Sequence, residues 1–99
     1  MKIADLPFAL DFGNGCGLTW VNDGQGNVIG AIEGHFTPEG KRCEGMVFFD
    51  VPELTEEWRR SPTQPWKVES WAPLTISPSV LCKICGNHGF IKGGLWVPA

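Results

Sequence analysis

The sequence predicts a single, mainly β domain over residues 1–99, built from a small antiparallel sheet and hairpins with one short helix. Thirteen glycines and eight prolines in 99 residues leave few uninterrupted stretches for long helices. The apolar runs are short and turn signals separate them. A hydrophobic content of 42% with 19% charged residues is typical of a globular chain. A zinc-stabilised α+β fold is the alternative.

Four strand candidates occupy the first half of the chain. They are residues 6–12, 18–21, 28–36 and 45–51. The segments between them are rich in glycine and asparagine or contain proline, which is the composition of tight turns. We therefore expect neighbouring strands to pair as antiparallel hairpins.

Residues 52–60 are the one helix candidate. Pro52 suits a first helical turn, and the glutamates that follow it favour the positive end of the helix dipole. A helix this short is stable only when it packs against other elements, and Leu54 and Trp58 are the expected contacts. Residues 61–65, which contain two prolines, are expected to end the helix as a loop.

The second half of the chain continues the strand pattern. Residues 66–71 and 74–77 are strand candidates because apolar and polar side chains alternate in them. Residues 90–97 form two apolar runs around a Gly-Gly pair, which predicts a C-terminal hairpin.

A metal site is predicted where Cys82, Cys85 and His88 follow one another at C-x2-C-x2-H spacing. Two cysteines at this spacing can direct both sulfurs at one ion, and Gly86 permits the tight turn that this requires. Thiolate and imidazole are the ligands that tetrahedral Zn²⁺ prefers. In a chain that buries only about two thirds of its unfolded surface, such a metal would add usefully to stability.

A closed tetrahedral site needs a fourth ligand from elsewhere in the chain. Cys16 is preferred because its neighbouring glycines let the backbone curl around an ion, while Cys43 and His35 are the alternatives. A site of four cysteines that leaves His88 free is also open. The competing interpretation is that the cysteines are ordinary reduced thiols and that His88 is a turn residue.

Other cysteine and histidine chemistry does not fit these motifs. Haem attachment needs C-x-x-C-H, and glycine follows Cys85. A thioredoxin-type motif opens a helix, which the glycine-rich residues 86–89 do not favour. A catalytic zinc would need an open position and a base such as Glu33 or Glu39, without any H-E-x-x-H pattern to support it.

The overall charge and the N-terminal sequence bear on partners and location. A formal net charge of -3 and a pI near 5.2 make nucleic acid an unexpected partner, because such binding needs a basic surface. The first residues lack the apolar run of a signal peptide, and no stretch has the length of a membrane span. We expect a cytoplasmic protein with reduced cysteines and no membrane contact.

The last third of the chain resembles a group of small proteins encoded by bacteriophages and prophages. The resemblance is carried by the S-P-S turn at residues 77–79, the C-x2-C-x2-H-G-F-I run at residues 82–91 and the G-x-W ending at residues 94–96. Residues 15–17 resemble part of a C-G-C-G element of more distant members. The resemblance implies a phage origin and a compact, zinc-bound β fold. It does not assign an activity to any residue of this chain.

The expected function is that of a non-enzymatic, zinc-stabilised binding module that contacts a protein in the host cytoplasm, such as a host or defence component. The acidic residues around the expected helix are a candidate contact face: Asp50, Glu53, Glu56 and Glu57. The alternatives are a small metal-dependent hydrolase or nuclease and a virion or assembly component. The sequence predicts neither the identity of the partner nor the oligomeric state.

Overall fold

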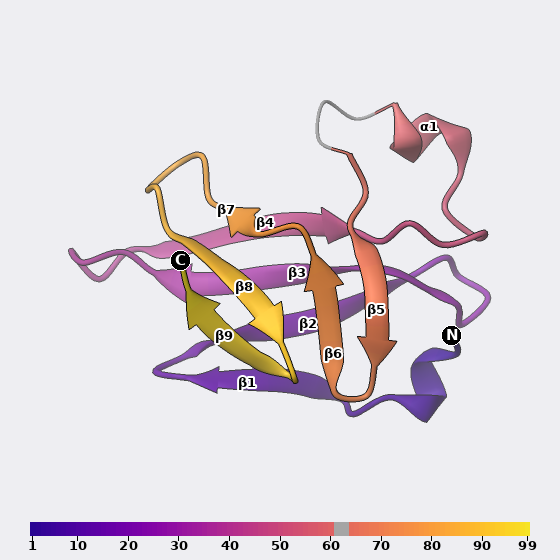
Figure 1. Ribbon diagram of the computed structural model, residues 1–99, viewed down its shortest axis with the longest axis horizontal. Helices are drawn as coiled ribbons and strands as arrows, with labels where there is room; N and C mark the ends of the chain where they lie inside the picture. The colour runs from indigo at the N-terminus through magenta and orange to yellow at the C-terminus, as the bar shows by residue number, and fades with distance from the viewer. Residues whose placement is uncertain (61–63) are drawn as a thin grey trace.

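The computed structural model describes residues 1–60 and 64–99 and confirms the mainly β fold with one short α-helix (Figure 1). The elements in chain order are the 3-10 helix η1 (Ile3–Asp5), the strands β1 (Ala9–Gly13), β2 (Cys16–Asn22), β3 (Val28–Phe36) and β4 (Arg42–Phe48), the helix α1 (Glu56–Arg59), and the strands β5 (Lys67–Trp71), β6 (Leu74–Ser77), β7 (Val80–Leu81), β8 (His88–Lys92) and β9 (Leu95–Pro98).

The first layer is a four-stranded antiparallel sheet in the order β1-β2-β3-β4. Its strands follow one another along the chain because each turn is short. Trp20, Ala31 and Val47 are paired across β2, β3 and β4, so their side chains share one face of the sheet. Ala31 and Val47 are almost fully buried there. That face is the inner face of the sheet.

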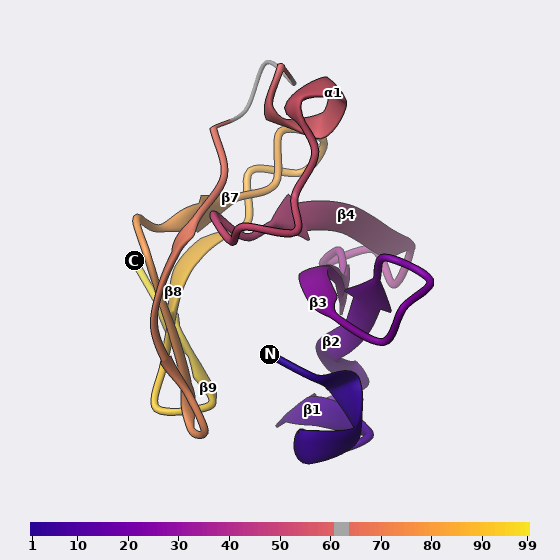
Figure 2. The same ribbon diagram turned by 90° about the vertical axis from the view of Figure 1, so that its right-hand side faces the viewer.

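The second layer contains the β5–β6 hairpin and the three-stranded sheet β7-β8-β9. The turn between β8 and β9 holds the two parts together. There Gly94 N–H donates to the carbonyl of Leu74 at 2.8 Å, and Gly93 N–H donates to Thr75 Oγ1 at 2.9 Å. Figure 2 shows the two layers facing each other, with β1–β4 on one side and β5–β9 on the other.

The core lies between these layers. Phe49 is fully buried and contacts Trp20 and Trp71 edge-on, with ring centroids 6.5 and 5.5 Å apart. Edge-to-face packing of this kind adds about 0.5–1.5 kcal/mol per pair beyond the burial of apolar area. The other largest fully buried side chains come from both halves of the chain: Val28, Leu74, Ile76 and Ile91.

The helix is shorter than the sequence predicts. Residues 52–55 form a turn instead, with Leu54 N–H bonded to the carbonyl of Val51 at 3.1 Å, and α1 begins only after Thr55. Leu54 is buried as expected, whereas Trp58 packs on Phe48 at 5.1 Å and stays about half exposed. Of the expected loop over residues 61–65, residues 61–63 lie outside the described part of the chain.

Strand boundaries differ from the expectations mainly at two places. The strand expected over 45–51 begins earlier, at Arg42, and ends at Phe48. Beyond that point Phe49 forms an isolated parallel bridge with Trp66, and Asp50 N–H donates to the carbonyl of Trp66. The expected strand over 6–12 is shifted to Ala9–Gly13 and follows η1. None of the helices among the described residues combines the length and the apolar character needed to cross a membrane.

Candidate metal centre

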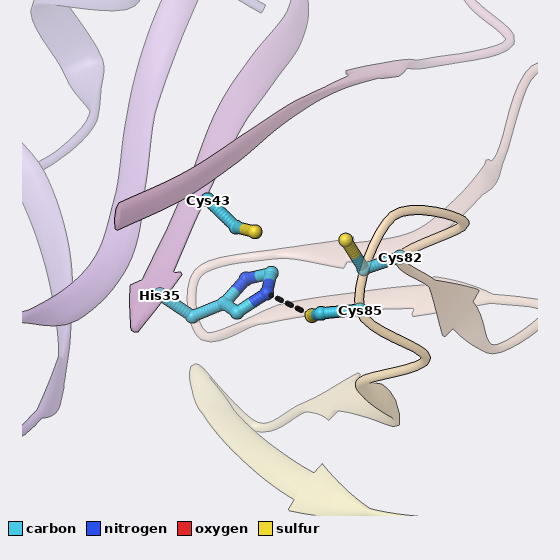
Figure 3. Close-up of side chains that lie close together, drawn as sticks. All are labelled: His35, Cys43, Cys82 and Cys85. Atoms are coloured by element: carbon cyan, nitrogen blue, oxygen red, sulfur yellow. Dashed lines mark hydrogen bonds between the residues drawn. The ribbon is translucent and has the colours of Figure 1, made fainter. Parts of the chain in front are cut away.

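Four side chains from the two layers converge at one end of the molecule (Figure 3). They are His35, Cys43, Cys82 and Cys85, and one potential ligand atom of each lies within 4.8 Å of all the others. His35 and Cys43 are buried, Cys82 is half-buried and Cys85 is exposed. Three thiols and one imidazole therefore surround a single point near the surface.

The hairpin of β3 and β4 supplies the first two ligands. His35 and Cys43 are directly paired across the strands, so their side chains emerge side by side on the inner face of the sheet. The turn between the strands sets this register through two backbone bonds. Thr37 N–H donates to the carbonyl of Lys41 at 2.8 Å, and Gly40 N–H donates to the carbonyl of Thr37 at 2.9 Å.

The loop between β7 and β8 supplies the other two ligands. Gly86 N–H donates to the carbonyl of Cys82 at 2.8 Å, and Cys82 N–H donates to the carbonyl of Asn87 at 2.8 Å. Gly86 adopts a left-handed conformation with φ of 80°, which closes the loop with little steric cost. Figure 3 shows that the loop points the sulfurs of Cys82 and Cys85 toward Cys43 and His35.

Glu33 orients the histidine from behind. Its two carboxylate oxygens lie 3.0 and 2.9 Å from His35 Nδ1, and both side chains are buried. A proton on Nδ1 that donates to this carboxylate leaves the lone pair on Nε2, which faces the sulfurs and lies 3.1 Å from Cys85 Sγ. Metal-binding histidines commonly have such a carboxylate partner, which fixes both the tautomer and the ring orientation.

The acid–base properties of the thiols favour a cation among them. The hydrogen bond with His35 is the main cause that lowers the pKa of Cys85 to about 7, whereas burial is the main cause that raises the pKa of Cys43 to about 11. Burial alone would lower the pKa of His35, but hydrogen bonds and negative charge from Cys85 and Glu33 raise it overall. Without a cation, this cluster therefore resists collecting several thiolate charges.

The spacing of the ligands suits a tetrahedral ion. Ligand atoms about 2.3 Å from a zinc ion in tetrahedral geometry are roughly 3.8 Å from one another. No two ligand atoms of this cluster are more than 4.8 Å apart, so a small inward movement of the side chains reaches that value. The donors, three cysteines and one histidine, also form a ligand set that many structural zinc sites use.

Two of the preferred ligands, Cys16 and His88, lie outside this cluster. Cys16 Sγ instead lies 3.7 Å from the carbonyl of Asn14, and His88 Nε2 lies 2.7 Å from Ser79 Oγ. The places expected for them are taken by the two residues that were held as alternatives, Cys43 and His35. Cys82 and Cys85 lie together as the sequence predicts.

The strand pattern explains why His88 is not part of the cluster. It is the first residue of β8, where Gly89 and Ile91 are buried, so the alternation of a strand turns the His88 side chain outward. Cys16 begins β2 and pairs with Gly13 of β1, two strands away from β4. A signal for the observed pair was present, because His35 and Cys43 are placed symmetrically about the turn between their strands.

No protein-family model matches the chain, and no curated protein or solved structure shows significant similarity to it. The metal centre and the surface around it are therefore the features of the molecule that indicate a function.

Proposed function

We propose that the protein is a small zinc-stabilised binding module whose metal is structural. The observation that carries the proposal is the convergence of four ligand atoms from His35, Cys43, Cys82 and Cys85 within 4.8 Å. Three sulfurs and one nitrogen favour Zn²⁺ over the hard cations Mg²⁺ and Ca²⁺, which prefer oxygen ligands. Because the cysteines are free and one of them is exposed, the site is open to loading.

A structural role is better supported than a hydrolase or nuclease activity. Four protein ligands complete a tetrahedral zinc shell, whereas a catalytic zinc keeps one position for water or substrate. Glu33, a candidate base, is engaged with His35 Nδ1. Glu39 is not a member of the ligand cluster. The arrangement therefore supports a metal that holds the fold together.

The position of the metal indicates what it would stabilise. His35 and Cys43 belong to the first layer, whereas Cys82 and Cys85 follow β7 of the second layer. A bound zinc would cross-link the layers at the end where the loop after β7 has no other regular structure. The function of the module would then be exerted by the surface that this cross-link orders.

We place that function in protein–protein contact inside a bacterial host, as the phage resemblance and the acidic charge suggest. The acidic face around α1 is a weaker candidate than the sequence indicates. Asp50 pairs with Arg59 at 2.6 Å, and Glu53 lies 3.9 Å from the N-terminal ammonium group. Both carboxylates thus already have positive partners within the chain. Among the residues that the structure describes, Glu56 and Glu57 form no ion pair, so they are what remains of this face.

Cobalt substitution tests whether the site is closed. Co²⁺ loaded in place of Zn²⁺ is expected to give the visible spectrum of a tetrahedral cobalt with thiolate charge-transfer bands, and added azide should leave that spectrum unchanged. A spectrum that shifts on titration with azide would show an open coordination position and would favour the hydrolase alternative. Mass spectrometry of purified phage particles would separate the host-directed role from the virion alternative.

A further inference from the structure

An apolar hollow of about 480 Å³ lies next to the metal centre. It is bordered by β4, by β7 and by the segment before β5. It is also bordered by the start of the loop between β7 and β8, residues 82–87, which we call the cysteine loop. Its apolar lining includes Met46, Val47, Trp66, Val80, Ile84 and Trp96. Its volume is in the range of sites that enclose a small ligand or one or two large side chains.

Gly45, which has no side chain, borders the hollow. Gly45 is paired with Glu33 and therefore belongs to the inner face of the first sheet. A Cβ atom added at Gly45 would have no neighbour within 4 Å. The space that a strand residue would normally fill is thus left empty beside the cysteine loop.

The edge of β4 beside the hollow carries unpaired backbone groups. The carbonyl of Phe48 accepts a hydrogen bond from Trp66 N–H at 2.8 Å, so it points away from β3. Because backbone groups alternate along an antiparallel strand, those of Met46 and Glu44 point in the same direction. Within residues 1–60 and 64–99, no strand pairs with this edge of β4 at those two positions.

The rim of the hollow carries exposed apolar side chains and two charged residues, Glu44 and Lys83. Ile84 is 81% exposed at the tip of the cysteine loop, and Leu81 is 52% exposed at the end of β7. Large apolar side chains exposed side by side in this way mark interaction surfaces. Glu44 lies at the same rim, and in the described part of the chain it forms no ion pair.

We propose that the open edge of β4 binds an extended peptide segment of the partner protein. The peptide would pair with the backbone of Glu44 and Met46 as an added strand, place a large apolar side chain in the hollow and carry basic residues that face Glu44. Backbone pairing at a sheet edge with a pocket for one side chain is an established mode of peptide recognition. The net charge of -3 also favours a basic peptide.

This inference rests on the proposed function, since the cysteine loop that carries Ile84 is the loop that the zinc would hold in place. It adds the location of the contact and the chemistry of the segment that binds there. The metal itself has no contact with the peptide in this scheme.

The test is an NMR titration of the zinc-loaded, ¹⁵N-labelled protein with the blocked peptide KTVWVTK. Saturable shifts are expected at the amides of Glu44, Met46 and Ile84 and at the indole groups of Trp66 and Trp96. Gly45→Leu, which fills the hollow, should weaken binding by about tenfold or more. Ile84→Asp should weaken it as well, and because Ile84 is exposed this variant does not depend on repacking the core. Thr19→Leu is the matched control, since Thr19 is exposed on the opposite face of the sheet.

Two further peptides separate the contribution of backbone pairing from that of the charged residues. The same peptide methylated on alternate backbone nitrogens should not bind if strand pairing is required, and the acidic version ETVWVTE should bind more weakly. Absence of saturable shifts, or equal affinity for Gly45→Leu and the wild type, would overturn the proposal. The zinc content of every sample is measured alongside. A protein that holds zinc without binding the peptide refutes only this inference, whereas one that binds the peptide without zinc refutes the proposed function.

Discussion

Replacement of Cys43 by serine should remove the metal and most of the stability that it provides. The substitution deletes one thiolate ligand on β4 and leaves the other three ligands in place. Cys16→Ser is the matched control because Cys16 is a free cysteine in the same sheet but outside the cluster. Both variants therefore replace one sulfur by oxygen, Cys43→Ser inside the ligand cluster and Cys16→Ser outside it.

The size of the effect follows from the loop that the metal closes. His35 and Cys85 are 50 positions apart, and a cross-link across such a loop stabilises a fold by about 4 kcal/mol through the entropy of the unfolded chain. Domains of this size have total stabilities of about 5–15 kcal/mol, so this is a large fraction. At roughly 4–8 °C of melting temperature per kcal/mol, removal of the metal should lower Tm by about 20 °C.

The assay is thermal unfolding followed by circular dichroism, with and without a zinc chelator. The wild type and Cys16→Ser should both lose about 20 °C on chelation. Cys43→Ser should melt at the same temperature in both conditions, because it has no metal to lose. Cys43 is not a zinc ligand if Cys16→Ser becomes insensitive to chelator, or if Cys43→Ser retains one tightly bound zinc.

Three further predictions concern the surroundings of the metal. Glu33→Ala should weaken zinc binding by about 10–100-fold in a competition titration with a chromophoric chelator. Glu33→Gln should recover part of this loss because its amide oxygen still accepts a hydrogen bond from His35 Nδ1. Equal zinc affinity in the wild type and both variants would show that the carboxylate has no positioning role. His88→Ala should keep its zinc and lose less than about 1 kcal/mol of stability in urea unfolding, because the His88 side chain lies at the surface with a hydrogen bond to Ser79 and a stack on Phe90. Loss of metal in this variant would return His88 to the ligand set. Below pH 7, zinc affinity should fall by more than about tenfold for each unit by which the pH is lowered. The pKa of Cys43 is about 11 and that of Cys85 about 7, so zinc must displace a proton from each of these thiols. A flat pH profile would contradict thiolate ligation.

The architecture could be predicted from the sequence where local patterns agree with the final packing. The strand Val28–Phe36 has the predicted bounds because turns flank it closely on both sides. The C-terminal hairpin was also predicted, since its Gly-Gly turn is a strong local signal. The helix was predicted too long, because the burial of Leu54 in a turn outweighs the helical preference of the residues before Glu56.

Of the four ligands of the metal centre, the sequence predicts only the two that are close together in the chain. The spacing of Cys82 and Cys85 identifies these two ligands without any knowledge of the fold. The choice of His35 and Cys43 depends on the register of a hairpin and on which layer faces the cysteine loop, and these are tertiary properties. His88 is close to the cysteines in sequence, but the start of β8 turns it to the other side.

The surface beside the metal was beyond the reach of sequence patterns altogether. The sequence shows Gly45 only as an interruption of an apolar run, yet in the structure it lies beside open space at the edge of β4. Trp66 directly precedes β5 and Trp96 lies in β9, and the tertiary fold places both of them at the hollow. The tryptophans could be anticipated as core or interface residues, but their common position could not.

X-ray absorption spectroscopy at the zinc edge reports the identity and number of the zinc ligands themselves. The protein loaded with one zinc per chain should show three sulfur scatterers at about 2.3 Å and one nitrogen at about 2.0 Å, with no oxygen from water. Cys16→Ser and His88→Ala should give the same shell, and Cys43→Ser should not. A shell with four sulfurs, a shell containing a water oxygen, or a purified protein that binds no zinc would contradict this assignment.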